Sequence, residues 1–143
     1  MSSFDSGRNR FSVGLGSVGN YQVAGVPWIT GSVNGLAAGD EDKLSFPSVT
    51  KTITVINTDV DSCDIHVHFN SKTRTDVTDG LHYVALNSLN DAMSFNIKCK
   101  EIYISNPDGS EAASYTVVAE LTGISSSEMF PLTGSGLTNK DGT

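Results

Sequence analysis

Alternating hydrophobic and polar residues between positions 93 and 121 predict consecutive β-strands. The apolar positions in the first half of this block are Met93, Phe95, Ile97 and Cys99. They alternate with polar residues, so one face of the strand is apolar and the other faces solvent. Ile102 and Ile104 continue the pattern with its parity moved by one residue, which predicts a bulge or a bend at residues 100–101. After a turn at residues 106–109, a further strand places its apolar side on Tyr115, Val117, Ala119 and Leu121.

Similar segments along the chain, separated by turn residues at short intervals, are typical of an antiparallel sandwich or barrel. The expected strands cover residues 43–46, 50–57, 64–70, 81–87, 93–99, 101–105 and 114–123. Pro47 separates the first two, so we expect residues 44–46 at an edge or just before a strand. Residues 125–128 have capping-box spacing, but Pro131 limits any helix there to about one turn. We predict an all-β fold with a single antiparallel β-sandwich, either jelly-roll-like or immunoglobulin-like.

The two ends of the chain differ from the sandwich. Residues 1–40 are rich in Gly and Ser and contain only short apolar pieces, so we expect an extended arm. Residues 41–124 then form the sandwich, and residues 125–143 form a tail too small and polar to pack independently. The apolar residues of both ends are candidates for contact with a partner: Tyr21, Val26, Trp28, Ile29, Met129, Phe130 and Leu132.

The charge of the chain argues against a nucleic-acid partner. Its net charge is -7, and its nine basic residues are scattered rather than clustered as phosphate binding requires. Charged residues make up 17% of the chain, below the roughly 25% of an average soluble protein. Such a surface suits contact with neighbouring protein, although an ordinary β-protein with hydroxyl-rich strands has the same composition. We expect no membrane partner, because no segment approaches the length of a membrane span.

The cysteines fit a reducing environment. Residues 1–6 lack a basic region leading into an apolar run, so we expect no secretory signal and synthesis in a cytoplasm. Cys63 and Cys99 share the parity of apolar neighbours, which predicts buried thiols that act as small hydrophobes. A disulfide between adjacent strands is the alternative. Two cysteines alone do not complete a tetrahedral metal site.

Three histidines are the main candidates for metal binding. His66 and His68 lie on one face of an expected strand, and His82 lies on a following segment that suits a hairpin partner. Such a cluster is able to bind zinc or another transition metal. Ile65 and Val67 occupy the core-facing positions of this strand, however, so we expect the histidines to point outward into solvent or toward a partner. No acidic ligand follows at the short spacing of a cupin site, and we predict no bound cofactor.

Other motifs give no catalytic site. Residues 14–19 match the spacing GxGxxG, but Gly and Pro follow where a dinucleotide-binding helix is required, so we expect a flexible arm. Asp59, Asp61 and Asp64 lack the glycine and terminal glutamate spacing of a calcium loop, which favours a solvated loop. No nucleophile has a recognisable base. We therefore expect a protein that is not an enzyme.

Aromatic residues leave a sugar-binding module as an alternative of another class. The candidates for a stacking face are Tyr21, Trp28, Tyr83, Tyr103 and Tyr115. Tyr115 has core parity. Tyr103 alternates with Ile102 and Ile104, and it alone is expected on an outward face. A single exposed tyrosine makes a poor platform.

The segment FNIKCKEIYIS at 95–105 is followed by Tyr115 and by AELTGI at 119–124. These segments resemble small virion structural proteins of tailed bacteriophages, especially marine and cyanophage-type viruses. The similarity extends to GNYQVAGVPWITG at 19–31, FPSVTK at 46–51 and MFPLTGSGL at 129–137. These are patterns of strands and turns, so the resemblance implies a structural role in the particle and no catalytic residues.

The resemblance implies a capsid decoration or cement protein on the exterior of the virion, made in the host cytoplasm. Its expected partners are the major capsid protein or other virion proteins, together with copies of itself in a homo-oligomer such as a trimer. A component of the tail or of the head-to-tail connection is the alternative. Many weak contacts per particle add up through simultaneous engagement.

Overall fold

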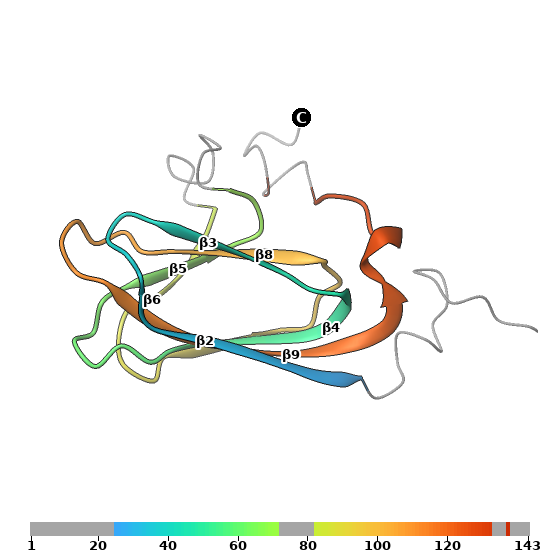
Figure 1. Cartoon of the computed structure of the whole chain (residues 1–143), viewed down its shortest axis with the longest axis horizontal. Helices are drawn as coiled ribbons and strands as arrows, with labels where there is room; N and C mark the ends of the chain where they lie inside the picture. Colours follow the sequence, from blue (N-terminus) through green and yellow to red (C-terminus); the bar gives the residue numbers. More distant parts are fainter. Residues whose placement is uncertain (1–24, 72–81, 133–136, 138–143) are drawn as a thin grey trace, which may run out of the picture.

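The computed structural model describes residues 25–71, 82–132 and 137. These residues form two packed, antiparallel four-stranded sheets, which confirms the predicted β-sandwich (Figure 1). The first, here called the β4–β9 sheet, has the order β2 (Val26–Leu36), β9 (Ala113–Ser125), β4 (Ser48–Asn57) and β7 (Ala92–Phe95). The second, the β5–β8 sheet, has the order β3 (Glu41–Ser45), β8 (Glu101–Ser105), β5 (Ile65–His68) and β6 (Val84–Leu86).

The core lies between the sheets and follows the period of two that the sequence predicts. Every second residue of four strands is buried: Ile53 and Val55, Ile65 and Val67, Ile102 and Ile104, and Tyr115, Val117, Ala119 and Leu121. Burying one large aliphatic side chain stabilises a fold by about 1.5–3 kcal/mol. The alternation therefore determines which face of each sheet points inward.

The parity change at residues 100–101 is a crossover between the two sheets. β7 ends at Phe95 in the β4–β9 sheet, and β8 begins at Glu101 in the β5–β8 sheet. Cys99 lies in this crossover and is fully buried. The single strand expected over residues 93–99 is thus wrong, because only β7 is extended and paired. Met93, expected in the core, is 42% exposed because β7 is a short edge strand with a neighbour on one side only.

Residues 26–36, which the sequence assigns to an arm, form β2 of the sandwich. β2 pairs with β9 from Val26 to Ser32 and again at Leu36, whose side chain is fully buried. Between these positions the register shifts, and Asn34 takes a positive φ of 52° while its N–H donates to Ser114 Oγ. Glycines and serines in this strand obscure its apolar alternation. The expectation that residues 26–36 lie outside the sheets is therefore corrected.

The C-terminal part of the described chain confirms the predicted single turn. η1 (Ser126–Glu128) is a 3-10 turn, and the Ser125 side chain accepts the N–H of Ser127. Val49, Ile124 and Met129 form a small second core cluster, against which Leu132 packs. Glu41–Ser45, as expected for its edge position, lies at the margin of the β5–β8 sheet.

Candidate functional site

The outer face of the β5–β8 sheet brings together three of the side chains that the sequence singles out, namely His66, His68 and Tyr103. The antiparallel register places Tyr103 between Lys43 and His68, and Ser105 between Glu41 and His66. We call these six residues the histidine face. Side chains directly opposite each other on one face of a sheet are close enough to interact.

His68 is buried at the centre of the histidine face, with 1% of its surface exposed. Its Nδ1 bonds the Asn70 carbonyl oxygen, and because a carbonyl only accepts, Nδ1 carries the proton. Nε2 lies 2.9 Å from the Ser105 hydroxyl oxygen, with which it forms a hydrogen bond, and a Glu41 carboxylate oxygen lies 3.8 Å from the same nitrogen. His68 lies on the outward face of the sheet as expected, but it is not solvated, because these groups and the ring of Tyr103 pack around it.

The Ser105–His68 pair has the contact of a nucleophile with its base, which the sequence does not reveal because the two residues are 37 positions apart. Catalysis requires more than this contact, since a substrate must reach the hydroxyl and find donors for a developing oxyanion. Ser105 is only 7% exposed. The pair is therefore a buried polar link between β5 and β8.

His66 is half-buried and stacks on Tyr83, with ring centroids 3.8 Å apart and planes within 10° of parallel. Burial lowers the pKa of His66, and the nearby Asp64 carboxylate opposes this shift without reversing it. The third histidine, His82, is also half-buried, and its Nδ1 has no hydrogen-bond partner among the described residues. His66 thus faces outward as expected, but its ring is partly covered by tyrosine.

The acidic loop after β4 is only partly solvated: Asp61 is exposed as expected, whereas Asp59 is not. Asp59 is buried, and its Oδ2 accepts the Cys63 N–H while its own N–H donates to Asn57 Oδ1. The Asn57 amide in turn donates to the carbonyl oxygens of Cys63 and Leu86. The expected solvated position of Asp59 is corrected, because this network closes the turn between β4 and β5.

Metal ligands do not assemble in the part of the chain that the structure describes. Within residues 25–71 and 82–132, no three His, Cys, Asp or Glu side chains come together as a group able to hold a metal ion. His68 Nε2 is engaged by Ser105, and Asp59 Oδ2 by a backbone N–H. Neither the histidines nor the aspartates therefore form a candidate metal centre there.

Both cysteines are free and buried, as the sequence predicts. Burial raises the pKa of the Cys63 thiol to about 11, and the neighbouring Asp59 carboxylate adds to the shift. Burial also raises the pKa of Cys99, partly offset by its contact with the Thr50 hydroxyl. The two residues act as small core side chains and not as a disulfide.

The aromatic side chains do not form an open sugar platform in the described structure. The Tyr103 ring lies beside His68, and its hydroxyl donates to Glu101. Burial and this hydrogen bond raise the pKa of Tyr103 to about 12. Tyr115 is in the core as predicted, and Trp28 packs edge-on against Phe46 with centroids 4.8 Å apart.

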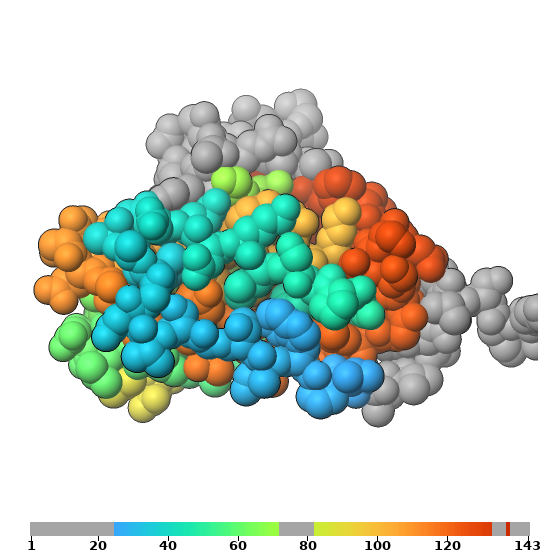
Figure 2. Space-filling view, viewed as in Figure 1, coloured from blue at the N-terminus to red at the C-terminus, as the bar shows by residue number. Residues whose placement is uncertain are grey.

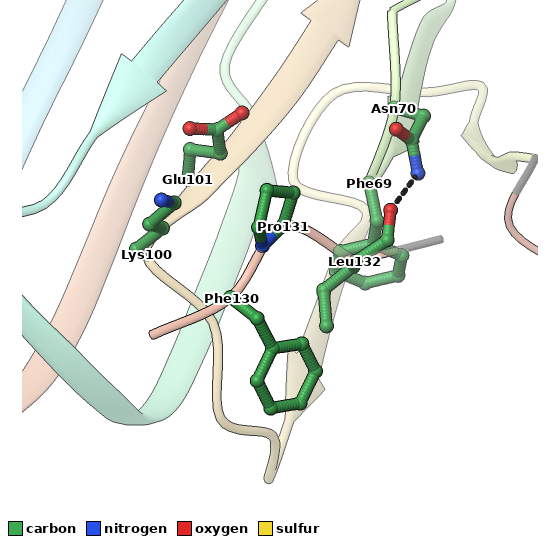
Figure 3. A pocket seen from close by; sticks show the side chains of 7 residues that line it. All are labelled: Phe69, Asn70, Lys100, Glu101, Phe130, Pro131 and Leu132. Atoms are coloured by element: carbon green, nitrogen blue, oxygen red, sulfur yellow. Dashed lines mark hydrogen bonds between the residues drawn. The ribbon is translucent and has the colours of Figure 1, made fainter. Parts of the chain in front are cut away.

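The pocket in Figure 3 lies where the end of β5 meets the C-terminal segment. It is lined by Phe69, Asn70, Lys100, Glu101, Phe130, Pro131 and Leu132. The Asn70 amide donates to the Leu132 carbonyl oxygen at 2.8 Å and holds the segment in place. The pocket encloses about 20 Å³, which is room for a water molecule. Small-molecule sites are roughly ten times larger or more.

The candidate partner-contact residues separate into exposed and buried groups. Val26, Ile29 and Phe130 are largely exposed. Met129 is buried in the second cluster, while Trp28 and Leu132 pack against the core. Tyr21 and the glycine motif at 14–19 lie outside the described residues.

The outer face of the β4–β9 sheet contains an uncharged region. Two neighbouring rows across all four strands carry no charged side chain, and we call them the apolar face. They are Ile29, Val118, Thr54 and Ser94, and Gly31, Thr116, Ile56 and Ala92. Ile29 is 70% exposed at one margin, and the Thr54 and Ser94 hydroxyls bond each other at the other.

Comparisons with protein-family models, with curated proteins and with solved structures find no match to this chain. Among the described residues there is no helix of the length and apolarity that crossing a membrane requires.

Proposed function

We propose that this chain is a non-enzymatic virion structural protein that binds neighbouring subunits of the particle, in the manner of a capsid decoration or cement protein. The apolar face is the observation that carries the binding role. It presents two uncharged rows across a whole sheet in a chain whose net charge is -7. An uncharged surface that exposes Ile29 and Val118 suits contact with protein, because charged residues are depleted at the centre of interfaces.

The composition of the apolar face fits contact with protein. Ile29 and Val118 supply exposed apolar area, and hydroxyl side chains such as Thr54 keep the face soluble before contact. Charged residues are depleted at the centre of protein interfaces because their burial costs free energy. Phe130, in the segment that follows η1, is a further exposed apolar side chain.

The phage assignment rests on the resemblance of the sequence to small virion proteins. A decoration protein needs a compact domain and a surface that matches a repeated partner, and modest affinity at each contact suffices when many copies bind. The major capsid protein is the proposed partner. A tail or connector component differs from a decoration protein in its copy number per particle.

Binding to particles tests this proposal directly. The full-length protein is mixed with particles that lack it, and co-sedimentation is compared for the wild type, Val118→Glu and Val60→Glu. Val118 lies within the apolar face, whereas Val60 is 78% exposed in the loop after β4 and serves as the matched control. We expect loss of binding for Val118→Glu alone. Equal binding of both variants would remove the apolar face from the contact.

Copy number separates the two virion locations. Quantitative mass spectrometry of purified particles should find the protein at the high copy number of a shell component. A low copy number in a multiple of three or six would instead assign it to the tail or connector. Absence from particles would refute the proposed function.

A further inference from the structure

Asn34 lies in an irregular stretch of β2 and is followed by Gly35. The register of β2 with β9 shifts at residues 33–35, which stand opposite Ser114 alone and form a bulge. Asn34 has a positive φ of 52°, and both Asn34 and Gly35 are exposed. Figure 2 shows β2, in blue, along the near side of the sandwich, where it is an edge strand. Solvent therefore reaches both residues.

Asn34 is the sole asparagine of the sequence that a glycine follows. The backbone nitrogen after an asparagine is a potential nucleophile toward the side-chain amide carbon of that asparagine. Because both groups belong to one short stretch of chain, the attack is intramolecular and needs no encounter between two molecules. Glycine favours the attack most, since it has no side chain to shield its nitrogen or to restrict its backbone.

Ser114 is placed to assist this attack. The Asn34 N–H donates to Ser114 Oγ at 2.8 Å, and the Ser114 hydroxyl donates to Asn34 Oδ1 at 3.4 Å. Negative charge develops on Oδ1 when a nucleophile adds to the amide carbon, so a donor at this oxygen stabilises the transition state. The exposed Asn87 differs, because the N–H of the following Ser88 is bonded to Asp91. Asn87 is therefore the less reactive comparator.

We propose that Asn34 is a site of spontaneous deamidation in the folded protein. The Gly35 nitrogen gives its proton to solvent base and bonds to Asn34 Cγ, and the bond from Cγ to the side-chain nitrogen breaks with release of ammonia. Water then adds to either carbonyl carbon of the resulting succinimide and opens the ring to aspartate or isoaspartate. No atom is oxidised or reduced, and water is the only co-reactant.

Deamidation changes the surface next to the apolar face. β2 has no Asp, Glu, Lys or Arg, and it supplies Ile29 and Gly31 to that face. Either product places a carboxylate on this strand and adds a negative charge to a chain whose net charge is already -7. The charge of the β2 edge therefore depends on the age of the protein.

A matched pair of variants tests the role of the Gly35 nitrogen. A Cβ at residue 35 would overlap Ser32 Oγ, whereas Ser32 Cβ lies 3.5 Å from it, an ordinary contact distance. Ser32→Ala therefore makes room for Gly35→Ala, and circular dichroism checks that both variants fold. We expect Ser32→Ala to convert like the wild type, and the double variant to convert about tenfold more slowly. Equal rates in the two variants would refute attack by this nitrogen.

Peptide mapping by mass spectrometry of the full-length protein measures the conversion independently of any virion. The native protein is incubated at mildly alkaline pH, and aspartate and isoaspartate are quantified at each asparagine over time. We expect conversion at Asn34 to be faster than at Asn87 by about tenfold or more. Absence of conversion at Asn34, or equal rates at the two positions, would overturn the inference.

Discussion

The Ser105 hydroxyl and Nε2 of His68 form a buried hydrogen bond of 2.9 Å that joins β8 to β5. Replacing Ser105 with Ala removes this partner from a ring that is almost fully desolvated. We expect Ser105→Ala to lower the free energy of unfolding by about 1–3 kcal/mol, the cost of a lost buried hydrogen bond. Urea unfolding measures it, and exposed Ser88→Ala should change stability by less than about 0.5 kcal/mol.

The same pair also predicts no serine-hydrolase chemistry. Because Ser105 and His68 are buried, we expect no covalent labelling of the native protein by a fluorophosphonate probe. Mass spectrometry of the treated protein checks this result. Stoichiometric labelling that disappears in Ser105→Ala would contradict the structural role given to the pair.

His66 makes stability depend on pH. Its folded pKa lies below its ordinary value of 6.5, so the unfolded chain takes up the proton first as pH falls. The stability that neutral His66 contributes to the fold is fully present above the pKa of His66 in the unfolded chain. It is lost as the pH falls through 6.5 toward the lower pKa of His66 in the folded chain. The midpoint temperature of thermal unfolding, measured from about pH 8 to about pH 5, should therefore fall more steeply for the wild type than for His66→Gln. The opposite order would show that the charged ring is favoured in the fold.

The two thiols should be nearly inert in the native protein. Burial raises the pKa of Cys63 to about 11 and also raises that of Cys99, so little reactive thiolate exists near neutral pH. Ellman's reagent should react slowly with the folded chain and release two equivalents in guanidinium chloride. Rapid reaction without denaturant would mean that one of the two sites opens to solvent.

Asn57 should be among the most sensitive polar positions. Its side chain donates to the carbonyl oxygens of Cys63 and Leu86 and accepts the N–H of Asp59. Asn57→Ala leaves buried backbone groups unsatisfied, so we expect a loss of about 3 kcal/mol or more in guanidinium unfolding. The exposed Asn87→Ala is the matched control. Similar stability of the two variants would show that the loop rearranges around the loss.

The strands of the sandwich were predictable wherever burial of one face gives the sequence an alternation of apolar and polar residues. β9, β8 and β5 each carry this pattern, and their inward residues are those the sequence identifies. β2 was not predicted because glycine, serine and a bulge interrupt its alternation. Met93 was wrongly predicted to be buried, because periodicity gives the direction of a side chain but not its distance from the sheet margin. The histidine face was recognisable only in part, since the pairing of β5 with β8 brings Ser105 and His68 together across 37 residues.

The sequence by itself determined the all-β class, the inward parity of the main strands, the buried free thiols and the single turn before Pro131. These properties depend on local alternation and turn chemistry, which neighbouring residues encode. Only the tertiary structure decided that residues 26–36 complete a sheet, that His68 and Asp59 are buried, and that an uncharged edge and face lie on the same sheet. Those features depend on register between strands distant in sequence, and no local pattern specifies that register.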